Sequence, residues 1–90
     1  MNRFLVEVFA PRASAGQLAT AERRARLAAR RLSGPDGEAR FVSATYIPED
    51  EICFYVFDAA SSRHATLVAR AAGLDPLRVV EAVSSQKEEQ

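Results

Sequence analysis

Two neighbouring segments in the middle of the chain combine a strand-like pattern with high hydrophobicity. Residues 38–47 are rich in β-branched and aromatic side chains, and residues 51–58 are apolar at almost every position. Pro48, Glu49 and Asp50 form a short connection between them, so the pattern predicts an antiparallel hairpin. A strand that is apolar on both faces has to be covered on both sides. The hairpin therefore predicts a sheet with two apolar faces, and one layer of helices would cover only one of them.

The segment before the hairpin predicts a strand and a long helix. Residues 4–9 alternate as in a strand and stop before a proline, which cannot donate a ladder hydrogen bond. Ser14 and Gln17 have the spacing of a capping box, and apolar residues recur behind them at helical intervals. We therefore expect a helix over residues 15–32, with Gly34 supplying a left-handed stop.

The segment after the hairpin predicts a second helix and a last strand. Ser61 or Ser62 can cap the helix, and Gly73 can end it. Residues 78–83 are expected to form the strand. Residues 84–90 are polar, and we expect them to be a frayed tail.

The order of these elements, strand, helix, strand, strand, helix, strand, is that of the ferredoxin-like fold. We expect residues 1–83 to form a single α+β domain, a βαββαβ sandwich in which two helices cover one face of a four-stranded antiparallel sheet. The third strand then places large side chains on both faces, Ile52, Phe54 and Val56 on one and Cys53, Tyr55 and Phe57 on the other. Leaving three of them in water would forfeit about 1.5–3 kcal/mol each. We therefore expect a homodimer through the bare face, the alternative covers being the tail or a bound ligand.

The charge balance and the cysteine content limit which binding partners and which cellular compartment we expect for this protein. Twelve Lys and Arg balance twelve Asp and Glu among ninety residues, so no long-range positive field exists to collect phosphates and we expect no nucleic-acid partner. The single cysteine excludes an intramolecular disulfide and fits a reducing compartment. The apolar run at the start is too short for a signal peptide or a membrane span. We expect a soluble cytoplasmic protein with no membrane partner.

Two glutamates are candidate functional residues because they lie inside otherwise apolar strands. Glu7 is in the middle of the first strand and Glu81 in the last, and these strands are neighbours in the predicted sheet. If both side chains share a face, they form either a tuned acid and base or a site for a hard cation. The alternative is that each glutamate lies at a wet edge or pairs with an arginine, for which Arg3, Arg40 and Arg78 are available at strand starts.

One cysteine and one histidine complete the candidate metal ligands. Cys53 has the chemistry of a soft-metal ligand, but a buried packing role is commoner for a lone thiol. His64 is in the first turn of the second helix, where we expect a surface position and a ring that the helix dipole keeps neutral. A transition-metal site would need His64 from two subunits, or help from Glu7, Glu81 and Cys53.

Hydroxyl groups within the apolar strands are the candidate ligand-binding groups. Thr45, Tyr46 and Tyr55 are placed as in a pocket that orients a small aromatic or keto ligand. The alternative is that they satisfy local backbone groups. The first helix also carries a cluster of arginines that lies opposite its apolar stripe, and for which we expect a solvated face: Arg23, Arg24, Arg26, Arg30 and Arg31.

Three segments resemble a known family: FLVEVF at the start, ATYIPEDEICFYVFDA in the middle and ARAAGLDPLRVVEAV at the end. They are similar to a bacterial family of small proteins described as a domain of unknown function, one branch of which is described as nickel-binding. The resemblance spans residues 3–83 and implies a ferredoxin-like homodimer and, through that branch, nickel binding. The nickel-binding branch commonly has a histidine beside the Ser-Tyr of its second strand, where this chain has Ala44 before Thr45 and Tyr46.

These observations rank three functions. The leading hypothesis is a non-catalytic homodimeric protein that binds a small ligand or a divalent metal such as nickel near Glu7 and Glu81. The second is a cofactor-free enzyme, an oxygenase, isomerase or cyclase, acting on a small apolar substrate, which requires a cavity around Tyr46, Tyr55 and Glu7. The third is an interaction or scaffolding subunit that acts only by dimerising.

Overall fold

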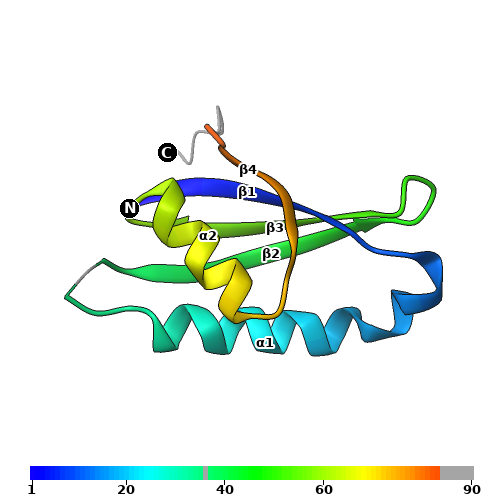
Figure 1. Ribbon diagram of the computed structural model, residues 1–90, viewed down its shortest axis with the longest axis horizontal. Coiled ribbons are helices and arrows are strands. Elements are labelled where there is room, and N and C mark those ends of the chain that lie inside the picture. Colours follow the sequence, from blue (N-terminus) through cyan, green and yellow to red (C-terminus); the bar gives the residue numbers. More distant parts are fainter. Residues whose placement is uncertain (36, 84–90) are drawn as a thin grey trace, which may run out of the picture.

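The described part of the chain forms four strands and two α-helices in the predicted order (Figure 1). The computed structural model describes residues 1–35 and 37–83, so the predicted tail, residues 84–90, lies outside the described residues. The elements are β1 (Asn2–Phe9), the short 3₁₀-helix η1 (Arg12–Gln17), α1 (Leu18–Arg31), β2 (Ala39–Ile47), β3 (Ile52–Ala59), α2 (Ser62–Ala71) and β4 (Pro76–Glu81). The two helices follow β1 and β3, as a split βαβ arrangement requires.

The strands form one antiparallel sheet in the order β2-β3-β1-β4. In Figure 1, α2 crosses in front of the strands while α1 runs along the side of β2. The predicted hairpin joins β2 to β3, with Ile47 directly opposite Ile52. Its turn ends at Glu51, which has a positive φ of 53°. The molecule thus has the expected α+β ferredoxin-like fold.

Burial alternates along the central strands, which identifies the face that the helices cover. On β3, Cys53, Tyr55 and Phe57 are buried, whereas the side chains between them, Ile52, Phe54 and Val56, are only half buried. Successive side chains of a strand point to opposite faces. The second set therefore belongs to the face without helices, which we call the open face.

Small side chains bring both helices close to the sheet. The buried residues of α1 are Ala25, Ala28 and Ala29, and those of α2 include Ala65, Val68 and Ala69. Alanine at a contact lets the helix backbone approach its neighbour, which preserves dense packing in a small core. Neither of these helices is long and apolar enough to cross a membrane.

The start of α1 differs from the prediction. Ser14 does not act in a capping box with Gln17, because it lies inside η1. Its hydroxyl donates instead to the Pro11 carbonyl across 2.7 Å. Pro11 therefore opens a tight turn, and α1 begins only at Leu18.

The end of α1 also differs, because Gly34 does not supply a left-handed stop. Among the described glycines, a positive φ occurs at Gly37 and Gly73, and Gly73 with φ 85° ends α2 as predicted. After α1, the Ser33 hydroxyl lies 2.9 Å from the Ala29 carbonyl and accepts the Ala39 N–H at 2.8 Å. A side chain thus connects the last turn of α1 to the first residue of β2.

An ion cluster joins one end of the three strands β1, β2 and β3. Asp58, which is 7% exposed, accepts hydrogen bonds from Arg3 Nε at 2.9 Å and from Arg40 Nη2 at 2.7 Å. The Arg3 hydrogen bond contributes most to lowering the pKa of the Asp58 carboxyl, and Arg40 adds to the effect, whereas burial opposes it. Two of the arginines expected to be available to the glutamates are therefore paired with an aspartate instead.

Candidate functional site

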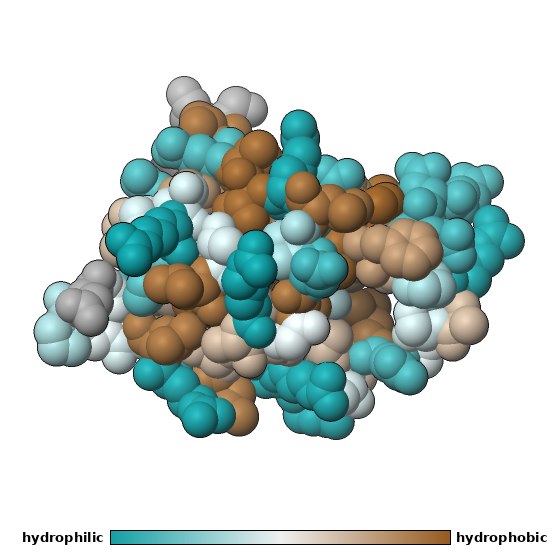
Figure 2. All heavy atoms as spheres, in the orientation of Figure 1, coloured by the Kyte–Doolittle hydropathy of each residue, from teal (hydrophilic) through white to brown (hydrophobic). Residues whose placement is uncertain are grey.

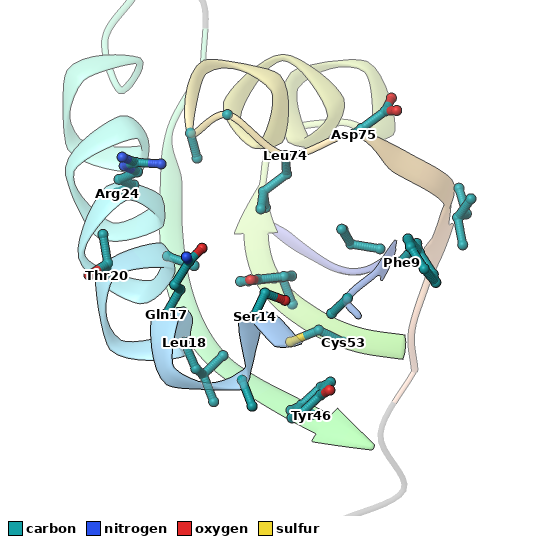
Figure 3. Close-up of a pocket in the computed structure, with 18 residues that line it drawn as sticks. Phe9, Ser14, Gln17, Leu18, Thr20, Arg24, Tyr46, Cys53, Leu74 and Asp75 are labelled. Atoms are coloured by element: carbon teal, nitrogen blue, oxygen red, sulfur yellow. The ribbon is translucent and has the colours of Figure 1, made fainter. Parts of the chain in front are cut away.

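A pocket of about 650 Å³ lies between the helices and the sheet. Its wall combines η1, the first half of α1, the adjoining ends of β1, β2 and β3, and the loop between α2 and β4 (Figure 3). The space stays open because small residues supply much of that wall, namely Ala10, Ala15, Ala21, Ala72 and Gly73. In the space-filling view, hydrophobic side chains are visible in a recess between α1 and the strands (Figure 2). A cavity of this size is typical of small-molecule sites, which range from about 300 to 1,000 Å³.

Tyr46 contributes an unpaired polar group to the pocket. It lies opposite Cys53 on the neighbouring strand, and both side chains line the cavity (Figure 3). The Tyr46 hydroxyl is buried and has no hydrogen-bond partner among the described residues. A buried hydroxyl without a partner costs about 1–3 kcal/mol, so a ligand that reaches this hydroxyl from the pocket would recover that cost.

Cys53 and Tyr55 form a neutral part of the same wall. Cys53 is 1% exposed and Tyr55 is 4% exposed. Burial raises the pKa of the Cys53 thiol, and it also raises the pKa of the Tyr55 hydroxyl well above its ordinary value. Both groups therefore stay protonated near neutral pH, where they can exchange hydrogen bonds but are poor nucleophiles.

Four polar residues of the pocket were not among the candidate site residues that the sequence predicted. Ser14, Gln17, Arg24 and Asp75 all line the pocket. In Figure 3 Arg24 belongs to α1 at one side of the pocket, while the Asp75 carboxylate on the loop after α2 points away from the pocket. Arg24 was expected on a solvated helix face. Its spacing from Gln17, two helical turns earlier, is the pattern that would have placed both on one side.

Thr45 lies apart from the other two candidate hydroxyls. It is exposed and stands opposite Phe54 on the open face. The expectation that Thr45 shares a pocket with Tyr46 is wrong, because adjacent residues of a strand point to opposite faces. Tyr46 and Tyr55 remain together on the pocket side.

Glu7 and Glu81, the candidate carboxylate pair, do not share a face of the sheet. Glu7 stands opposite Arg78 across β1 and β4, whereas Glu81 stands opposite Phe4, whose side chain faces the helices. The two carboxylates therefore belong to opposite faces of the sheet. Arg78 Nε donates to Glu7 Oε1 across 3.1 Å, and Glu81 is exposed, so the alternative interpretation of an ion pair and a wet edge fits this geometry. Glu7 is not part of the pocket wall.

His64 is buried rather than at the surface as expected. It is 9% exposed, and its backbone N–H donates to the capping Ser61 hydroxyl at 3.1 Å. Its Nε2 atom is buried and has no hydrogen-bond partner within the described residues. The ring packs against Gly37 in the turn before β2.

The four candidate metal ligands do not meet in this structure. Glu7 is on the open face, Glu81 is on the edge strand, Cys53 lines the pocket and His64 begins α2. Over residues 1–35 and 37–83, no three His, Cys, Asp or Glu side chains are grouped in a way that could hold a metal ion.

Comparison with known proteins agrees with the fold. No family model matches the chain, and no curated protein was found to match it. Among solved structures, the chain is similar to SCO4226 from Streptomyces coelicolor A3(2), with a TM-score of 0.78 and 15% sequence identity over 93% of this chain and 99% of that chain. At this identity the similarity concerns the fold alone. The chain therefore shares its α+β ferredoxin-like fold, over nearly its whole length, with this Streptomyces protein.

Proposed function

We propose that this protein binds a small, mainly apolar molecule in the pocket between its helices and its sheet. The observation that carries the proposal is Tyr46, a residue of the pocket wall whose buried hydroxyl has no hydrogen-bond partner among the described residues. A bound carbonyl, hydroxyl or amide would pair with this hydroxyl and recover a desolvation cost of about 1–3 kcal/mol.

The remaining wall favours binding over cofactor-free catalysis. The Cys53 thiol and the Tyr55 hydroxyl are held protonated by burial, which removes them as nucleophile or base near neutral pH. The carboxylate among the pocket residues, Asp75, points away from the cavity (Figure 3). A pocket with apolar walls and a few neutral hydrogen-bonding groups is suited to reversible binding of a ligand without a chemical reaction.

A neutral aromatic probe, naphthamide, tests this proposal by titration in heteronuclear NMR. A probe of this size that gains about 0.3 kcal/mol per non-hydrogen atom binds with a dissociation constant of about 1 mM or tighter. We expect the largest shifts at backbone amides of the pocket wall, in η1, β3 and the loop after α2.

A matched pair of tryptophan variants provides the control. Ala15 and Ala13 are both exposed residues of η1, but only Ala15 lines the pocket. We expect Ala15→Trp to obstruct the cavity and weaken binding, while Ala13→Trp binds like the parent. Failure of naphthamide and of a wider set of apolar fragments to shift any pocket amide would contradict the proposal.

We also propose that the open face pairs with a second copy of this chain. The described residues leave a row of half-buried apolar side chains there: Leu5, Ile52, Phe54, Val56 and Val80. The charged groups beside them are already paired, Glu7 with Arg78 and Asp58 with Arg3 and Arg40. Apolar burial of about 1.5–3 kcal/mol per large side chain then favours contact with another apolar sheet. A self-complementary contact of this kind produces a two-fold dimer.

Light scattering coupled to size exclusion tests the dimer. We expect a mass close to twice the 9.8 kDa of one chain, falling to one chain for Phe54→Glu on the open face. The matched control is Leu67→Glu, because Leu67 is 49% exposed on α2, away from the open face. A parent protein that remains a single chain at concentrations of about 0.1 mM would overturn the dimer, as would a dimer that is lost with Leu67→Glu but not with Phe54→Glu.

A further inference from the structure

We infer that the ligand of the pocket is an amphipathic anion, with an apolar body against the sheet and a carboxylate or similar anionic group on Arg24 at the rim. The inference rests on the proposed ligand-binding function and adds the charge and the orientation of the ligand. The positions of the charged groups around the cavity carry it.

Arg24 is the cation placed to meet a bound anion. It is an exposed residue of α1 that lines the pocket (Figure 3). Within residues 1–35 and 37–83, Arg24 forms neither an ion pair nor a side-chain hydrogen bond. Its neighbours on the helix are engaged, since Arg23 donates to Thr20 at 3.3 Å and Arg26 lies 5.2 Å from the centre of the Phe41 ring.

The acidic side chains near the pocket indicate where a negative charge on the ligand would be unfavourable. Burial is the main cause of the raised pKa of Cys53 and of Tyr55, and the negative charge of Glu22 adds to both increases. The charge of Glu22 thus disfavours a further negative charge beside these two residues. Asp75, on the loop after α2, points away from the cavity (Figure 3). An anion is thus disfavoured at the inner wall and favoured at the rim beside Arg24.

A single ligand can satisfy both Arg24 at the rim of the pocket and the neutral groups of its inner wall. A planar guanidinium binds a carboxylate through two parallel hydrogen bonds, which orients the ligand as well as attracting it. At the inner end, the unpaired Tyr46 hydroxyl and the neutral Cys53 and Tyr55 groups accept an aromatic or aliphatic body that carries one neutral polar atom. Aromatic acids and short acyl acids have this combination.

The test compares two probes of the same shape, naphthoate and naphthamide, at neutral pH. We expect the parent protein to bind naphthoate about 3 to 10 times more tightly, the range for a charged hydrogen bond at a partly exposed site. In Arg24→Gln this preference should disappear, because the affinity for naphthoate falls while that for naphthamide is unchanged. Arg23→Gln is the matched control, since Arg23 is an exposed arginine of the same helix that does not line the pocket, and it should retain the preference.

The two proposals fail in different ways. If neither these probes nor the wider set of apolar fragments binds, the ligand-binding function itself is contradicted. If both bind equally to the parent, or if Arg24→Gln retains the preference for naphthoate, the pocket binds ligands but the assignment of an anionic group to Arg24 is overturned. Thermal unfolding of each variant, compared with the parent, separates a loss of affinity from a loss of folding.

Discussion

Tyr46 and Cys53 lie directly opposite each other on β2 and β3, and both face the same pocket. The thiol is protonated because burial raises its pKa, and the tyrosine hydroxyl has no hydrogen-bond partner among the described residues. A protein that keeps an unpaired polar group beside a cavity pays for it in stability unless a ligand completes the hydrogen bond. This relationship is the physical basis of the proposed function and leads to the first prediction.

Replacing Tyr46 by phenylalanine should separate stability from binding. The change removes a buried hydroxyl that has no partner within the described residues, so we expect the free energy of unfolding to stay the same or to rise by about 1 kcal/mol. The affinity for naphthamide should fall at the same time, because its amide loses the Tyr46 partner. Urea unfolding and NMR titration measure the two effects.

Tyr55→Phe is the control for that experiment. Tyr55 is 4% exposed, and the neighbouring Cys53 thiol contributes to the raised pKa of its hydroxyl. Removing this hydroxyl takes away its interaction with the thiol, so we expect the free energy of unfolding to fall by up to about 1 kcal/mol. A loss of stability in Tyr46→Phe as large as that in Tyr55→Phe would show that the Tyr46 hydroxyl is paired after all.

We expect Asp58 to make the free energy of unfolding depend on pH under acidic conditions. The Arg3 hydrogen bond is the main cause of its lowered pKa, so the carboxylate is more stable in the folded than in the unfolded chain. Its contribution is fully present above the ordinary pKa of 3.8 and is lost as the pH falls through the lower folded value. We expect Asp58→Asn to cost about 1–2 kcal/mol at neutral pH, a modest value because both arginines are largely exposed, and less at low pH.

Unfolding in urea at several pH values between about 2 and 7 checks this behaviour, since that interval spans the titration of carboxyl groups. Asp50→Asn serves as the control, because Asp50 is an exposed residue of the β2–β3 turn without an ion pair to another described residue. A stability difference between Asp58→Asn and the parent that stays constant over the whole interval would refute the assignment.

Gly37 should not tolerate a side chain. Its φ is 139°, and a Cβ built there would lie 2.8 Å from the Ala60 Cβ. Both the backbone conformation and the contact are unfavourable, so we expect Gly37→Ala to cost about 1–3 kcal/mol. For a domain of this size, each kcal/mol lowers the melting temperature by about 4–8 °C.

Gly34 is the matched control for that substitution. It belongs to the same turn, facing Gly37 in an isolated bridge, but no atom lies within 4 Å of the position its Cβ would occupy. Gly34→Ala should therefore melt within a few degrees of the parent. Equal melting temperatures for Gly37→Ala and Gly34→Ala in a calorimetric scan would rule out the predicted clash.

The order of the elements could be predicted because it is encoded locally. The period-two pattern of β1 and β3, the turn after Ile47 and the glycine that ends α2 are properties of short segments. The prediction failed where two local signals competed. Ser14 has capping-box spacing, but the proline before it opens a 3₁₀ turn that uses the same hydroxyl.

The candidate site was harder to predict because it depends on register. β4 begins at Pro76, and its pairing with β1 shifts between Glu7 and Val8. Since a change of one residue in register moves a side chain to the other face of a sheet, the sequence could not place Glu7 relative to Glu81.

By itself, the sequence determined the type and order of the elements and the alternation that gives β3 two apolar faces, because these depend on neighbouring residues. Only the tertiary structure decided that Arg24, Tyr46 and Asp75 border one cavity. They come from a helix, a strand and a loop that are far apart along the chain. Their distances depend on how closely the alanine-rich helices approach the sheet, and this packing is a property of the whole domain.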